Sequence, residues 1–166
     1  MKHYLIGYIT QTQTTKEAAQ QIALQLENNS SQQISIEVCS LETIKNLETY
    51  DKIILGSPIH GMRVMPEFSE FLSNHKEQLS GRLQGLYVVS YLYPTCRTFW
   101  KKLILRGIQR LSRSHGVTRY AVFGGKLPEA MPTFVRFIFG TPDGAPLDSR
   151  DTQEIDRWVN DSLELN

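Results

Sequence analysis

The stretch from Tyr8 to Ala23, YITQTQTTKEAAQQIA, decides how we interpret the rest of this chain. The apolar run before it has the composition of a strand, and the apolar residues after it recur at helical spacing. Residues 10–15, TQTQTT, therefore form a loop between a strand and the start of a helix. Free N–H groups at a helix N-terminus attract phosphate, and hydroxyl side chains add further donors. The alternative is a hydroxyl-rich helix cap that holds no ligand. The hydroxyls belong to Thr10, Thr12, Thr14 and Thr15.

Length and composition predict an ordinary globular protein. The 166 residues fit a single domain spanning 1–166, and the formal net charge is only +1. We expect no secretory leader, and no apolar run approaches the roughly 18 residues that a membrane helix needs. Cys39 and Cys96 lie in unrelated segments and match no metal-binding spacing, so we interpret them as free thiols of a cytoplasmic protein.

Segments with strand and helix patterns alternate along the whole chain. This alternation predicts an α/β fold in which a five-stranded, doubly wound parallel sheet carries helices on both faces, as a three-layer sandwich. The predicted strands cover residues 4–9, 34–39, 52–57, 85–91 and 120–123. Helices are expected to begin after the threonine loop and at Pro66, and to cover about 98–112 and 150–163, the last one capped by Asp148 or Ser149.

Ligands of such sheets bind at the carboxyl ends of the strands, where the strand order reverses. This rule selects three loops, residues 10–15, 57–64 and 91–98. Tyr91 and Tyr93 in the third loop offer aromatic faces for a flat ligand, although rim packing would explain them equally well. A phosphate loop beside two loops with apolar and aromatic residues fits a phosphorylated, planar heterocycle.

Four segments give the chain a family resemblance. They are residues 10–15 (TQTQTT), 50–59 (YDKIILGSPI), 123–128 (FGGKLP) and 148–151 (DSRD), the last leading to Trp158. Together they resemble the flavodoxin-like fold, in the branch that includes the menaquinone-dependent protoporphyrinogen oxidases. The resemblance implies bound FMN, electron transfer through its ring system, and a redox partner or substrate such as a quinone or porphyrin. The segment from Tyr91 to Arg97 is brief, whereas those oxidases carry a longer insertion after the fourth strand.

The resemblance also implies which residues hold FMN. The expected site residues are Thr10, Thr12, Gln13, Thr14 and Thr15 at the phosphate, Ser57, Pro58, Ile59, His60 and Gly61 on one side of the ring, and Tyr91, Leu92 and Tyr93 on the other. Gln13 stands where the family pattern has glycine. If this position requires a positive φ, a glutamine costs roughly 1 kcal/mol or more. His60 is either a wall residue or a proton donor. No catalytic residue is assigned, and no metal site is expected.

Charge is distributed unevenly along the sequence. Residues 81–126 contain nine basic residues and no acidic one. Lys102, Arg106, Arg110 and Arg113 recur at helical spacing, which indicates a basic stripe on one helix. Such a stripe is either a solvated face or a surface for an anionic partner, for example a membrane surface or a porphyrin carboxylate. Nucleic acid is not expected, because no recognition motif accompanies the charge.

The segment Met131–Phe139, MPTFVRFIF, is strongly apolar. It either packs an inserted helix on the core or forms an exposed patch for a membrane, quinone or apolar substrate. The sequence thus favours an FMN-dependent oxidoreductase or electron-transfer protein. The rival interpretation is a flavodoxin-fold binding module that has lost flavin and uses its basic helix, and Gln13 is the residue that favours it.

Overall fold

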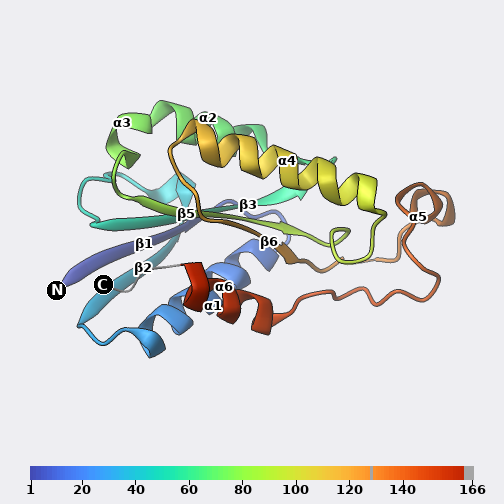
Figure 1. The fold of residues 1–166 in the computed structure, drawn as a ribbon, viewed down its shortest axis with the longest axis horizontal. Coiled ribbons are helices and arrows are strands. Elements are labelled where there is room, and N and C mark those ends of the chain that lie inside the picture. The colour runs from blue at the N-terminus through green and yellow to red at the C-terminus, as the bar shows by residue number, and fades with distance from the viewer. Residues whose placement is uncertain (128, 163–166) are drawn as a thin grey trace.

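The centre of the protein is a sheet of five parallel strands, seen in a computed structural model that describes residues 1–127 and 129–162 (Figure 1). The strand order is β2-β1-β3-β5-β6, so the order reverses between β1 and β3. The strands are β1 (Lys2–Tyr8), β2 (Ile34–Ser40), β3 (Lys52–His60), β5 (Leu83–Ser90) and β6 (Tyr120–Gly124). The predicted α/β architecture is confirmed, with strand ends that differ by up to three residues.

Helices cover both faces of this sheet and complete three layers. Figure 1 shows α1 and α6 below the sheet and α2, α3 and α4 above it. Their bounds are α1 (Thr14–Asn29), α2 (Pro66–Asn74), α3 (Lys76–Leu79), α4 (Thr98–Ser114) and α6 (Thr152–Ser162); a short 3-10 turn, η1, covers Leu41–Thr43. None of the helices in the described part of the chain is long and apolar enough to cross a membrane.

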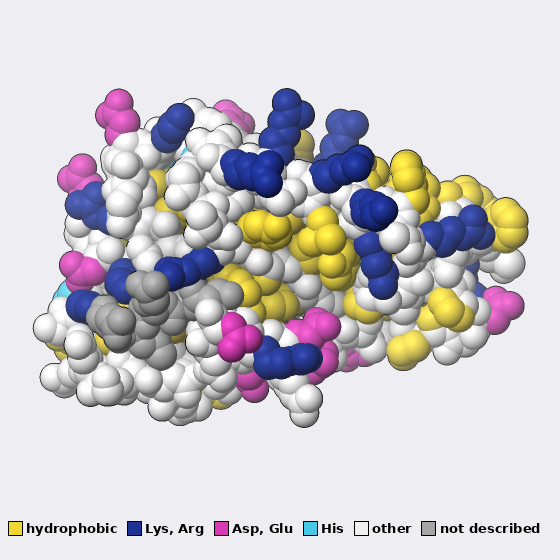
Figure 2. Space-filling view, viewed as in Figure 1, with side chains coloured by type: hydrophobic (Ala, Val, Ile, Leu, Met, Phe, Trp, Pro, Cys, Tyr) yellow, Lys and Arg dark blue, Asp and Glu magenta, His cyan; other side chains and the backbone are white. Residues whose placement is uncertain are grey.

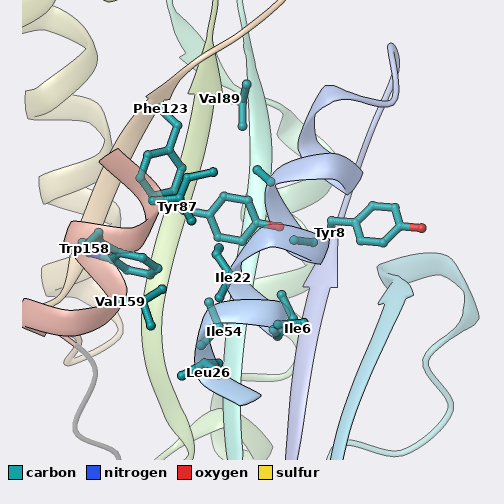
Figure 3. Close-up of a cluster of buried hydrophobic side chains, with 14 of the residues drawn as sticks. Ile6, Tyr8, Ile22, Leu26, Ile54, Tyr87, Val89, Phe123, Trp158 and Val159 are labelled. Carbon is teal, nitrogen blue, oxygen red and sulfur yellow. The ribbon is translucent and has the colours of Figure 1, made fainter. Parts of the chain in front are cut away.

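Two apolar cores lie between the three layers. Successive strand residues point to opposite faces, so Ile54 packs toward α1 and α6 while Leu55 packs toward α2 and α4. Figure 3 shows the first core, in which the fully buried Tyr87 lies among side chains of the sheet, α1 and α6. Both faces of the central strands are therefore buried, which explains their nearly continuous apolar sequence.

The third strand is longer than predicted. We expected it to end at Ser57 and a loop to follow, but β3 continues to His60 and pairs antiparallel with β4 (Arg63–Val64). Gly61 and Met62 both have positive φ, at 55° and 66°. Two consecutive residues with positive φ are typical of the tight turns that join hairpin strands. Residues 57–64 are thus mainly a rigid β3–β4 hairpin.

A long excursion separates β6 from α6. Its two ends are joined, because Leu127 N donates to Leu147 O at 2.9 Å and Ser149 N donates to Gly125 O at 2.9 Å. Between them α5 (Thr133–Phe139) projects at one end of the molecule (Figure 1). No residue of α5 is buried, and Phe134, Phe137 and Ile138 are 68%, 75% and 48% exposed. The expectation that this segment packs on the core is therefore wrong. The alternative, an exposed apolar patch, is confirmed for Phe134, Phe137 and Ile138.

The last helix begins later than predicted. It starts at Thr152, and Asp151 caps it through a 2.9 Å hydrogen bond from Gln153 N to the Asp151 carboxylate. The predicted caps have other partners: Ser149 Oγ donates to Gly125 O at 2.8 Å, and Asp148 pairs with Arg150. The predicted end at Leu163 lies outside the described residues.

Candidate functional site

The threonine loop connects the carboxyl end of β1 to α1, as predicted. Gln13 is the residue before the helix and has φ 65° and ψ −17°, in the left-handed region. Its carbonyl oxygen accepts the first hydrogen bond of α1, from Glu17 N at 3.0 Å. Position 13 therefore does require a positive φ. Gln13 adopts there, with a side chain, a conformation that glycine adopts without strain.

In the part of the chain that the structure describes, no side chain caps the free N–H groups in the first turn of α1. Thr12 Oγ1 and Thr14 Oγ1 lie 3.3 Å apart, and Thr14 Oγ1 donates to Thr12 O at 3.4 Å. Among the described residues, no threonine hydroxyl accepts a bond from an N–H of this turn, and Gln13 provides no side-chain cap. The buried Thr10 hydroxyl likewise has no partner within the described chain. Unused donors therefore gather at this helix N-terminus.

A hollow of about 460 Å³ opens beside this loop. Its lining residues are Thr12, Thr14, Glu17, Lys126, Leu127 and Leu147. Thr15 does not line it, because its side chain is buried and its carbonyl oxygen accepts a 3.4 Å hydrogen bond from the Tyr87 hydroxyl. The hollow thus combines hydroxyls, a lysine and a helix N-terminus, which suits an anion.

The charge of Glu17, which lines this hollow, is partly offset by Arg150. Arg150 forms ion pairs with Glu17 and with Asp148, linking α1 to the segment that precedes α6. The hydrogen bonds that Arg150 donates to Asp148 lower the pKa of Asp148 to about 2, and the bonds that Arg150 donates to Asp148 and Glu17 raise the pKa of Arg150. Without Arg150, the Glu17 carboxylate would oppose an anion bound at the same helix end.

A second, more apolar hollow adjoins the first. Its volume is about 270 Å³, and Leu127 lines both hollows. It is lined by Ile59, Gly61, Met62, Ser90, Tyr91, Leu92, Leu127, Met131 and Phe139. The carboxyl ends of β3 and β5 and the start of the excursion supply these residues. The pair of hollows therefore offers a polar end and an apolar end at the edge of the sheet where the strand order reverses.

The structure brings together only part of the predicted ring site. Ile59, Gly61, Tyr91 and Leu92 line the apolar hollow, whereas Ser57, Pro58, His60 and Tyr93 line neither hollow. Ser57 is fully buried and donates to Pro58 O at 2.9 Å. Pro58 pairs with Val89 within the sheet, His60 is exposed on the hairpin, and Tyr93 lies 5.9 Å below Lys101 Nζ.

Sequence reasoning missed the contribution of the excursion. Met62, Lys126, Leu127, Met131, Phe139 and Leu147 line the two hollows but were not selected from the sequence. Lys126 and Leu127 belong to the FGGKLP segment, so its position after the last strand was an available signal. For Met131 and Phe139 the sequence showed only an apolar run, and it did not indicate which part of the protein this run contacts. Tyr91 ties the excursion down, because its hydroxyl donates to Pro146 O at 2.7 Å.

The Cys96 thiol on the third loop lacks the lowered pKa of a reactive cysteine. Cys96 is buried, and this burial raises the pKa of its thiol. Among the described residues, no group of three or more His, Cys, Asp or Glu side chains is arranged to hold a metal ion.

Comparison with known proteins agrees with this geometry. The family model described as a flavodoxin domain matches residues 5–139, and the chain belongs to that family. A search of curated proteins finds no significant match.

Solved structures with the same fold share little sequence with this chain. A flavodoxin from the domain Archaea is 14% identical with a TM-score of 0.60, covering 95% of this chain and 93% of its own. The two-electron reduced flavodoxin of Megasphaera elsdenii is 18% identical with a TM-score of 0.59, covering 94% and 97%. A Fusobacterium nucleatum flavodoxin mutant bound to flavin mononucleotide is 18% identical with a TM-score of 0.53, covering 96% and 94%.

Proposed function

We propose that this protein binds FMN non-covalently in the two adjoining hollows and transfers electrons to a redox partner. The observation that carries the proposal is the uncapped N-terminus of α1, with the unpartnered Thr10 hydroxyl, next to an apolar hollow at the strand-order reversal. FMN, when bound, supplies one- and two-electron chemistry through its isoalloxazine ring. The likeness to a flavodoxin mutant bound to flavin mononucleotide supports the same choice.

The residues of the polar hollow would bind the phosphate group. Thr12 and Thr14 present hydroxyls, the first turn of α1 presents N–H groups, and Lys126 adds a positive charge. Arg150 reduces the repulsion between Glu17 and an anion by pairing with Glu17. These groups favour a terminal phosphate over an uncharged alcohol, because hydrogen bonds to a charged group contribute roughly 1.5–3 kcal/mol.

The residues of the apolar hollow would hold the ring system and exclude water. Tyr91 is fixed by its bond to Pro146 O, and the hairpin holds Ile59 and Met62 on a rigid turn. Phe139 closes the opposite side, where its ring packs edge-on against Trp100 at 5.2 Å. A fixed apolar enclosure of this kind orients a flat ligand without adding charge to it.

The test compares FMN with riboflavin, which lacks the phosphate. We expect the purified protein to be yellow, to release FMN on denaturation, and to bind FMN much more tightly than riboflavin in a fluorescence titration. Thr12→Ala with Thr14→Ala should weaken FMN binding by roughly 1–3 kcal/mol and leave riboflavin binding unchanged. Equal affinities for FMN and riboflavin would exclude the phosphate site, and absence of any flavin binding would favour the rival binding module.

We propose a second role at an anionic membrane surface, carried by the exposed patch of α5. Figure 2 shows basic side chains along α4 and exposed apolar side chains over α5 on the same face. Phe99 at the start of α4 is also 68% exposed, so aromatic groups lie beside the basic stripe. Basic residues near an anionic bilayer contribute about 1 kcal/mol each, and exposed aromatic side chains insert at the interface.

Vesicle co-sedimentation tests this role. Wild type should bind anionic vesicles at low salt and dissociate at high salt. Phe134→Ser with Phe137→Ser should abolish binding, as should replacement of the four stripe residues by glutamine. Leu24→Ser is the matched control, because Leu24 is an exposed apolar residue on α1, on the other side of the sheet. Equal binding to neutral and anionic vesicles would contradict the electrostatic part of the proposal.

A quinone or porphyrin is our proposal for the partner in the redox reaction, following the sequence resemblance. The apolar character of the ring hollow and the basic surface beside it support both. Stopped-flow oxidation of the reduced, FMN-loaded protein by menadione, and quinone-dependent oxidation of a porphyrinogen, are separate tests. A porphyrinogen that is not oxidised would exclude the second activity and leave the first intact.

A further inference from the structure

A groove of about 630 Å³ runs between α4 and the β3–β4 hairpin. It is separate from the two hollows of the proposed flavin site. We call it the α4 groove. Its apolar walls are formed by Ile59, Met62 and Val64 from the hairpin and by Trp100, Leu103 and Ile104 from α4. Leu103 is 41% exposed and Trp100 is half-buried, so these side chains present apolar surface to solvent along the groove. Apolar walls of this size are typical of a small-molecule site.

Three arginines rim the α4 groove: Arg63 from the hairpin, and Arg106 and Arg110 from α4. All three are exposed, and no carboxylate lines the groove. Within the described part of the chain, none of the three forms an ion pair or hydrogen bond through its guanidinium group. A guanidinium group recognises carboxylate, sulfonate or phosphate through paired N–H donors, so the rim is complementary to an acidic group.

A glycine in the middle of α4 helps to open this groove. Gly107 lines it, and a Cβ added there would meet nothing within 4 Å. Glycine inside a helix is less favourable than alanine, so local stability does not explain its presence. The missing side chain leaves space between Leu103 and Arg110.

The α4 groove adjoins the proposed flavin site through the hairpin. Ile59, Gly61 and Met62 line both the groove and the apolar hollow. A molecule in the groove would therefore contact the same hairpin turn as a ring in the hollow. The hairpin is the shared wall of the two sites.

We propose that the α4 groove binds an anionic amphiphile, meaning a small organic acid with an apolar body. The body lies on Trp100, Leu103 and Met62, and the acidic group is held by Arg63 and Arg110. Because the groove lies next to the proposed flavin site, small organic acids of this kind are the candidate substrates. The assignment as substrate rests on the proposed function. Binding in the groove itself does not require FMN.

The test uses two probes that differ by one sulfonate group, anilinonaphthalene sulfonate and the uncharged N-phenylnaphthylamine. Both are titrated calorimetrically into the full chain, with and without saturating FMN. We expect the sulfonate to bind about tenfold more tightly than the neutral probe, because it gains charge-assisted hydrogen bonds. Added FMN occupies the hollow and should leave this preference in place. Flavin absorbance in the same samples reports FMN binding separately, so each proposal can fail alone.

Matched variants locate the binding. Arg63→Gln with Arg110→Gln should lower sulfonate affinity about tenfold and leave the neutral probe unchanged. Lys102→Gln with Arg113→Gln removes the same charge from α4 outside the groove and should change neither affinity. Gly107→Leu should weaken both probes by filling the groove, whereas Gly107→Ala should keep most of the binding. Circular dichroism and thermal unfolding check that each variant folds.

Three results would overturn the proposal. The first is equal affinity of wild type for both probes. The second is sulfonate binding by the Gly107→Leu variant, or by the Arg63 and Arg110 variant, that equals the wild type while the variant remains folded. Loss of binding in the Lys102 and Arg113 variant to the same extent would also overturn it, because attraction would then follow net charge rather than the groove.

Discussion

At the scale of single residues, the site depends on conformations and contacts that run against ordinary propensities. Gln13 occupies a left-handed conformation, which costs a residue with a side chain roughly 1–2 kcal/mol. Asp148 and Arg150 lie at the surface and form a bidentate pair, and Arg150 also pairs with Glu17. Strain of this kind is commonly retained where a loop must approach a ligand.

We predict that Gln13→Gly stabilises the protein by up to about 1 kcal/mol, because glycine adopts φ 65° without a Cβ clash but also adds freedom to the unfolded chain. FMN affinity should stay the same or rise. Urea unfolding and flavin titration are the measurements, and Gln11→Gly in the same loop, where φ is not positive, is the control that should destabilise. A more than tenfold loss of FMN affinity would instead identify the Gln13 side chain as a ligand contact.

We predict a loss of stability in acid that depends on Asp148. Its pKa is about 2 in the folded protein and 3.8 in the reference state. A carboxyl group with a lowered pKa stabilises the fold above its unfolded pKa, and this contribution is lost as pH falls from about 4 to 2. Asp148→Asn should therefore flatten the fall of the urea midpoint over this window. The effect is small, because the pair is exposed to solvent.

At the scale of elements, glycine has opposite consequences at two positions, one tightly packed and one open. A Cβ at Gly124, the last residue of β6, would lie 1.8 Å from Ser149 O. The segment that contains Ser149 would therefore have to move. The Gly107 position in α4 is open, so a methyl group there meets no neighbour. The same substitution should therefore have opposite effects at the two sites.

We predict that Gly124→Ala destabilises the protein by about 1–3 kcal/mol, the usual cost of overpacking. It should also weaken FMN binding, because Leu127 and Leu147 would separate. Gly107→Ala should stabilise by roughly 0.5–1 kcal/mol through helix propensity. Chemical denaturation of the two variants measures both values. Equal and small effects would mean that the segment before α6 adjusts freely to β6.

At the scale of the whole molecule, the sheet and its helices hold the fold, and the excursion completes the site. Residues 129–146 contribute Met131 and Phe139 to the apolar hollow but little to the two cores. The excursion is attached by a few contacts, including Arg97 N to Phe139 O at 2.9 Å and Trp100 Nε1 to Ile138 O at 3.1 Å. Stability and binding are therefore separable.

We predict that replacing residues 129–146 by a short glycine–serine turn leaves a folded protein with much weaker FMN binding. The ends are already paired between Leu127 and Leu147, so a turn can join them. Far-UV circular dichroism and thermal unfolding should remain close to wild type, while flavin titration should show the loss. Riboflavin and FMN should both be affected, because the ring hollow is the part removed. If the shortened variant no longer unfolded cooperatively, the excursion would be needed for folding as well as for binding, and the prediction would be wrong.

The sequence by itself determined the three layers, the doubly wound parallel sheet and the place of the threonine loop between β1 and α1. These depend on local signals, namely apolar periodicity, helix starts and clustered hydroxyls, whose meaning does not change with context. Only the tertiary structure decided which residues face the hollows. A strand continued through Pro58 into a hairpin because Gly61 and Met62 could adopt the turn, and that moved Ser57 and His60 away from the site. Likewise, the apolar run 131–139 could have packed on the core, but the backbone hydrogen bond from Leu127 N to Leu147 O holds the two ends of the excursion together, and α5 stays outside the two cores. Side-chain destinations of this kind depend on contacts between distant segments, and no local pattern encodes them.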